Sequence, residues 1–62
     1  MSPKELRIWR ILNDLTQEQL ARHLGIDSRT VRKWENKERK MPPYLWMAVR
    51  YLERELLMNE MY

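Results

Sequence analysis

The sequence predicts a small all-α domain built from four to five short helices. Two capping boxes mark helix starts, at Ser2 and at Thr16. A single glycine, Gly25, marks a helix end, and the last third of the chain repeats apolar residues at spacings of four, three and four. With 62 residues, the chain is expected to form one domain over residues 1–62.

The first helix begins at Ser2, whose hydroxyl and the carboxylate of Glu5 form an S-x-x-E capping box. The inward side of this helix is predicted to carry Leu6, Trp9 and Leu12. Arg10 lies beside that apolar stripe, so its charge requires a partner. The pair Asn13 and Asp14 ends the helix.

Two helices joined at Gly25 follow. Thr16 and Gln19 form the second capping box, and Asp27 caps the next helix. The inward residues are expected to be Leu20, Ala21, Leu24, Ile26, Thr30, Val31 and Trp34. The outward side of the later helix carries Ser28, Arg29, Arg32 and Lys33. Core packing does not require three cations and a hydroxyl on one side of a helix.

The remaining chain consists of a basic loop and a long helix. The loop ends in two prolines, which exclude helix there, and the helix is expected over about residues 44–58. Its regular stripe consists of Leu45, Val49, Leu52 and Leu56. Apolar residues also lie outside that stripe, at Tyr44, Trp46, Met47, Tyr51, Met58, Met61 and Tyr62. This excess favours a homodimer over packing within one chain.

The positive charge is concentrated in the middle third of the chain. Residues 22–40 hold seven basic and three acidic side chains, whereas the segments on either side are neutral or slightly acidic. A solvated helix face is one interpretation of such a run, and a phosphate-facing surface is the other.

The stretch from Leu15 to Asn36 resembles the Cro/C1-type (XRE-type) helix-turn-helix family of phage and bacterial repressors. The matching residues are Leu6, Trp9, Arg10, Leu15, Thr16, Gln17, Leu20, Ala21, Leu24, Gly25, Ile26, Ser28, Thr30, Val31, Trp34, Glu35, Asn36 and Pro42. The family often has glycine where this chain has Lys37. The Pro-Pro-Tyr segment and the long helix after it are similar to very small phage regulators, including those encoded beside anti-CRISPR genes.

The resemblance implies a lambda-repressor-like fold, with a helix-turn-helix core over about residues 16–36 and a role for each exposed group. The helix from Ser28 would enter the major groove, where Ser28, Arg29, Arg32 and Lys33 would read bases. Phosphates would be contacted by Gln17, Asn36, Lys37, Arg39 and Lys40. Arg10 would form a structural ion pair with Glu35. Separately from the resemblance, the apolar excess of the last helix leads us to expect a dimer interface formed by Leu45, Trp46, Val49, Leu52 and Leu56.

The sequence gives little support for a metal site, a cofactor site, an enzyme active site or a membrane span. The chain has no cysteine and one histidine, His23, without ligand partners at suitable spacing, so we expect no metal and no cofactor. Phosphate loops, nucleophile motifs and carboxylate pairs are lacking, and an enzyme is not expected. No apolar run reaches the length of a membrane span, which favours a cytoplasmic protein.

The sequence therefore predicts a transcriptional regulator, most simply a repressor that binds an inverted-repeat operator in double-stranded DNA as a homodimer. Two alternatives remain open. One is an antitoxin that also binds a toxin as its protein partner through the C-terminal helix. The other is a protein-interaction module whose basic helix meets an acidic partner in place of DNA.

Overall fold

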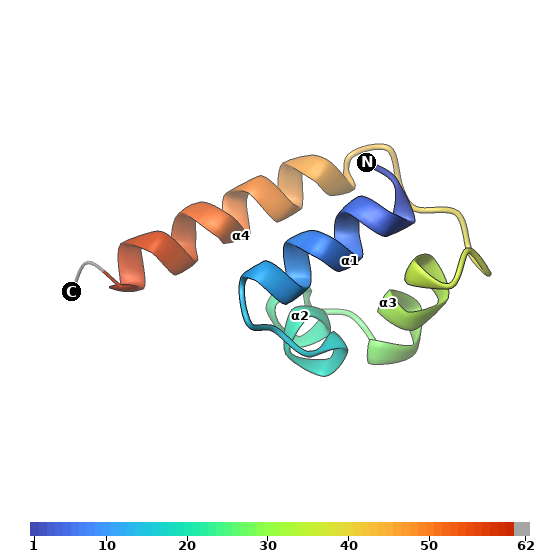
Figure 1. Cartoon of the computed structure of the whole chain (residues 1–62), viewed down its shortest axis with the longest axis horizontal. Helices are drawn as coiled ribbons and strands as arrows, with labels where there is room; N and C mark the ends of the chain where they lie inside the picture. The colour runs from blue at the N-terminus through green and yellow to red at the C-terminus, as the bar shows by residue number, and fades with distance from the viewer. Residues whose placement is uncertain (61–62) are drawn as a thin grey trace.

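The computed structural model describes the backbone of residues 1–60 and the side chains of residues 1–58. It contains four helices, α1 (Pro3–Leu12), α2 (Gln17–Leu24), α3 (Ser28–Glu35) and α4 (Leu45–Glu60), and no strand within the described residues. Figure 1 shows α4 running along α1, with α2 and α3 on the other side of α1. The predicted all-α fold class is therefore confirmed.

Local signals in the sequence set the helix ends. Reciprocal capping boxes close the start of α1, at Ser2 and Glu5, and the start of α2, at Thr16 and Gln19. Gly25 ends α2 with a φ of 71°, the left-handed region that glycine adopts without steric cost. Because each of these signals satisfies backbone groups left free at a helix end, short helices become stable enough to pack.

A single apolar core joins all four helices. Its buried members are Leu6, Leu20, Ala21, Val31, Trp34, Leu45, Val49 and Leu52. Two inward predictions are wrong. Leu12 is 77% exposed, because it lies six residues after Leu6 and therefore points away from the buried side of α1. Ile26, expected in the core, lies at its edge and is 36% exposed.

Helix α4 closes this core with its regular stripe. Leu45, Val49 and Leu52 are buried within the one chain, and Leu56 packs partly against the same core. The predicted dimer interface must therefore be corrected, since these side chains are already covered by their own chain. Of the five predicted interface residues only Trp46, at 48% exposure, lies on the open surface.

The outer side of α4 carries further exposed apolar surface. Its exposed large apolar side chains are Trp46, Met47, Leu57 and Met58, and the exposed Tyr51 lies at the border with the hollow that faces α2. Met61 and Tyr62, which the prediction assigned to the same surface, lie outside the described residues. The 16 residues of α4 span about 24 Å, and Figure 1 shows the far end of this helix extending beyond the end of α1.

Candidate DNA-binding surface

A rigid two-helix unit is formed by α2 and α3. The backbone N–H of Ile26 donates to the carbonyl of Ala21 at 2.9 Å, which closes the turn after Gly25. Leu20 on α2 and Val31 on α3 are both fully buried in the shared core. These contacts set the angle between the two helices and with it the direction that the outward side of α3 faces.

An ion pair connects this unit to α1. Arg10 Nε lies 2.7 Å from Glu35 Oε2, and a second bond of 2.9 Å joins Arg10 Nη2 to Glu35 Oε1. Arg10 Nη1 also donates to the carbonyl of Leu15 at 2.9 Å. This is the pair implied by the family resemblance, and it provides the partner that the charge of Arg10 requires.

Gln17 joins the same network. Its Nε2 donates to Glu35 Oε1 at 3.2 Å, so this side chain is directed toward the end of α3. The backbone N–H of Gln17 belongs to the first turn of α2, where amides have no partner within the helix. Because the side chain of Gln17 is bonded to Glu35, its backbone amide is the more available of its two donor groups.

The outward side of α3 is basic and open to solvent. Arg29, Arg32 and Lys33 are exposed, whereas the fourth predicted base-reading residue, Ser28, is half-buried in the first turn. Since Val31 and Trp34 supply the buried side of the same helix, apolar and cationic side chains are separated around its axis. The three cations remain on the surface without contributing to the core.

Arg29 is held by the residue that caps its helix. Asp27 Oδ1 accepts the backbone N–H of Arg29 at 2.7 Å, and the guanidinium lies 3.3 Å from both carboxylate oxygens. The side chains stay 74% and 53% exposed for Arg29 and Asp27, respectively. Hydrogen bonds from Arg29 lower the pKa of Asp27, and the same contact raises the pKa of Arg29.

The loop after α3 continues the positive surface. Asn36, Lys37, Arg39 and Lys40, all predicted to contact phosphates, are exposed. Lys37 has a φ of 63°, the left-handed conformation that favours glycine, at the position where the family often has one. The backbone N–H groups of Glu38 and Arg39 donate to the carbonyl of Lys33, which keeps the loop against the end of α3.

A family model described as Helix-turn-helix matches residues 6–56, which is most of the chain and includes the two-helix unit. The chain belongs to the Cro/C1-type helix-turn-helix family. Members of this family are DNA-binding transcription regulators, a group that is typically not enzymatic. No curated protein and no solved structure matches the chain.

One contact at the start of α3 does not follow from the sequence prediction. Asp27 was predicted only as a helix cap, yet it also binds the side chain of Arg29. The signal was present, because a capping aspartate and an arginine two positions later lie beside each other at a helix start. The contact of Gln17 with Glu35 joins residues 18 apart in the chain, and no local pattern predicts it.

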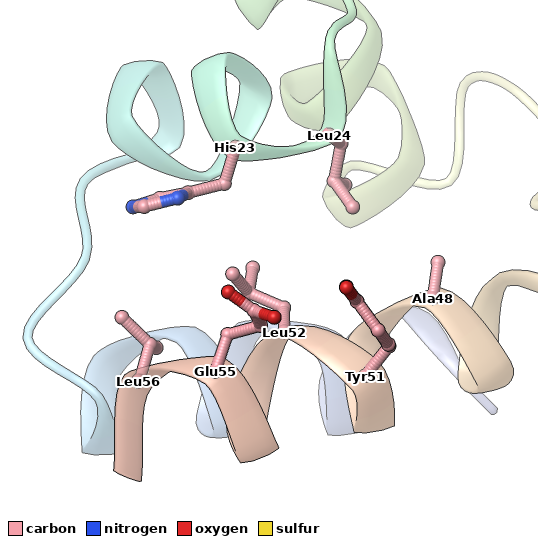
Figure 2. A pocket seen from close by; sticks show the side chains of 7 residues that line it. All are labelled: His23, Leu24, Ala48, Tyr51, Leu52, Glu55 and Leu56. Atoms are coloured by element: carbon pink, nitrogen blue, oxygen red, sulfur yellow. The ribbon is translucent and has the colours of Figure 1, made fainter. Parts of the chain in front are cut away.

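The described part of the chain offers little for other chemistry. Figure 2 shows a hollow between α2 and α4, where His23 faces Glu55, Tyr51 and apolar side chains. The Glu55 carboxylate beside Tyr51 raises the pKa of that phenol. Within the described residues no group of three acidic, histidine or cysteine side chains is placed to hold a metal, and no helix has the length and apolar character to cross a membrane.

Proposed function

We propose that this protein represses transcription by occupying an inverted-repeat operator as a homodimer, with α3 in the major groove of each half-site. The observation that carries the proposal is the open, basic side of α3. Arg29, Arg32 and Lys33 are exposed there, while the opposite side of the helix holds the core together. The major groove of B-DNA is wide enough to admit one α-helix.

The proposed base readers differ in their expected contributions. Arg29 lies in the first turn of α3, the part of a reading helix that reaches deepest toward base edges. An arginine can bind guanine O6 and N7 with two hydrogen bonds, and each such pair discriminates by about 1–3 kcal/mol. Arg32 and Lys33 lie one turn later and would bind bases or flanking phosphates, with Ser28 adding a hydroxyl near the helix start.

Phosphate contacts would come from both ends of the two-helix unit. The backbone amide of Gln17 and the first turn of α2 suit a phosphate on one side. On the other side, the exposed loop would contact the backbone through Asn36, Lys37, Arg39 and Lys40. Such contacts position the protein without reading the sequence, so they make binding dependent on salt.

The homodimer would form through the outer side of α4. Trp46, Met47 and Leu57 are about half exposed, and these large apolar groups gain by being covered. A two-fold dimer would place two copies of α3 about one DNA turn apart, roughly 34 Å, on a palindromic site. The antitoxin alternative uses the same surface, with a different protein in place of the second copy.

Selection of bound sequences from a random double-stranded DNA pool tests the DNA-binding proposal. We expect an enriched half-site that occurs twice in inverted orientation, and binding that weakens steeply between about 50 and 200 mM salt. Absence of any gel shift at low salt would exclude DNA binding. Enrichment of a single half-site would contradict the homodimer while keeping the sequence-specific binding.

Sedimentation of the wild type and of Met47→Glu tests the interface on α4. The wild type is expected to sediment as a dimer, and the variant as a folded monomer, because a buried carboxylate opposes association. Glu55→Gln, on the same helix but lining the hollow beside α2, is the control and should leave the dimer intact. A wild type that stays monomeric at high concentration would remove the dimer and leave the surface for another protein.

A further inference from the structure

The guanidinium of Arg29 uses one of its two hydrogen-bonding edges within the protein. Its Nε and Nη2 each lie 3.3 Å from a different oxygen of Asp27, which is the side-on arrangement of an arginine and a carboxylate. Within the described residues Nη1 donates to no protein group. The second edge, made of Nη1 and the remaining hydrogen of Nη2, is therefore open at the exposed start of α3.

From this geometry we infer that Asp27 is a positioning residue that determines specificity, holding the open edge of Arg29 ready for the O6 and N7 atoms of one guanine. The inference rests on the proposed function, since it concerns how the reading helix selects a base. The two parallel N–H groups of the open edge match the two acceptors that guanine presents in the major groove.

The cap fixes the carboxylate before DNA arrives. Asp27 Oδ1 accepts the backbone N–H of Arg29 at 2.7 Å, so the carboxylate is anchored to the helix and not to a flexible segment. An anchored carboxylate removes rotamers from an otherwise exposed arginine, and the entropy lost on binding a base is correspondingly smaller.

The carboxylate of Asp27 also disfavours the binding of backbone phosphates by Arg29. An arginine next to DNA can form hydrogen bonds with any backbone phosphate, which gives affinity without sequence selectivity. A negative charge beside the guanidinium disfavours a phosphate there, while guanine is neutral and escapes this repulsion. Asp27 would thus lower binding to random DNA and raise the ratio of specific to non-specific affinity.

The test replaces Asp27 by asparagine, which caps helices as well as aspartate does. The amide oxygen can still accept the backbone N–H, but an N–H donor now faces a guanidinium donor, so the side-on arrangement is lost. A second variant, Asp27→Ser, also keeps the cap and serves if the first fails to fold. Glu55→Gln on α4 removes the same charge far from α3 and is the control for net charge.

Affinities are measured for the selected site, for single-base variants of it and for random DNA. We expect Asp27→Asn to reduce the preference at one G·C pair about tenfold, to leave the other positions unchanged and to bind random DNA more tightly than the wild type. The control should keep the preference. In an Arg29→Ala background, the change at Asp27 should no longer alter the preference at that pair.

The possible outcomes separate this inference from the proposed function. If Asp27→Asn and Asp27→Ser both keep the full preference while Arg29→Ala loses it, Arg29 reads the base without help and the inference is wrong. If Arg29→Ala also keeps the preference, a different residue reads that base and the inference is equally wrong. If the wild type shifts no DNA at low salt, the proposed function fails, and the inference fails with it.

Discussion

The two-helix unit of α2 and α3 and the long helix α4 differ in where they place their apolar side chains. In the two-helix unit, apolar and charged side chains lie on separate sides, and of the predicted inward apolar residues only Ile26 is exposed. In α4, one stripe is buried and large apolar side chains also occupy the outer side. The two-helix unit has most of its apolar side covered within the chain, whereas α4 leaves large apolar side chains exposed.

This difference shows how a very small domain divides its residues between the core and the surface. A chain of 62 residues buries a modest fraction of its surface, so each buried side chain carries much of the stability. The two-helix unit devotes its inner side to that core and its outer side to charge. Helix α4 contributes to the core through three buried residues and leaves Trp46, Met47 and Leu57 uncovered.

Replacing a core residue of the two-helix unit should have the largest effect. Leu20→Ala is expected to lower the free energy of unfolding by about 3–5 kcal/mol, because the side chain is fully buried and leaves a cavity. Leu57→Ala, on the outer side of α4, should change it by less than about 0.5 kcal/mol. Urea unfolding followed by circular dichroism, at a concentration where the protein is monomeric, measures both. Equal losses would erase the contrast between the two regions.

Breaking the ion pair should have the next largest effect. Glu35→Ala is expected to cost about 3 kcal/mol, since it leaves Arg10, whose side chain is 13% exposed, without its carboxylate. Replacing both partners, Arg10→Met with Glu35→Leu, should recover part of this loss because no unpaired charge remains. Thermal unfolding of the two variants compares them. A double variant less stable than Glu35→Ala would show that the pair contributes more than charge compensation.

Relieving the backbone strain at Lys37, in the loop after α3, should have a smaller effect, and this change should stabilise the protein. Lys37→Gly is expected to raise the free energy of unfolding by about 1 kcal/mol, because lysine is strained at a φ of 63°. Asp14→Gly, at a φ of 55°, is the matched control and should gain less, since aspartate tolerates this region better. If Lys37→Gly destabilised the protein, the side chain of Lys37 would be making a contact that outweighs its strain.

The pH dependence of the α3 cap should be the smallest effect. The pKa of Asp27 is lowered from its ordinary value of 3.8, mainly by hydrogen bonds from Arg29, so the carboxylate stabilises the fold above that value. This contribution is lost as the pH falls through the lower pKa of the folded protein. Melting temperatures of the wild type and Asp27→Ala should therefore differ at neutral pH and converge as the pH falls below the ordinary pKa of an aspartate. A constant difference would mean that the charge plays no part in the cap.

Much of the fold follows from local signals in the sequence. Capping residues such as Thr16 and Asp27 act within three positions of themselves, and Gly25 sets one backbone angle, so the helix ends are readable from the chain. The outward side of α3 follows from helical periodicity alone. Periodicity does not specify which surface covers an apolar stripe. The sequence therefore predicts that a second copy covers the stripe of α4, whereas in the structure this stripe closes the chain's own core.

The candidate DNA-binding surface could be predicted to a similar extent, because periodicity indicates which residues are exposed but not which side chains they contact. Exposure of Arg32 and Lys33 follows from their position around the helix. The direction of the Gln17 side chain depends on where α3 ends in space, and the pairing of Asp27 with Arg29 depends on rotamers. Such contacts combine several weak preferences, and each of them is comparable in energy to the competing contact with water.

The separation of the basic side of α3 from its buried side also bears on how such a protein can change over time. The groups that hold α3 in place, Val31 and Trp34 in the core and Glu35 in the ion pair, are different residues from the cations on its outer side. Substitutions among Arg29, Arg32 and Lys33 therefore leave the scaffold intact. Under the proposed function, a lineage of such chains could acquire new target sequences through these exposed positions, without passing through unfolded intermediates.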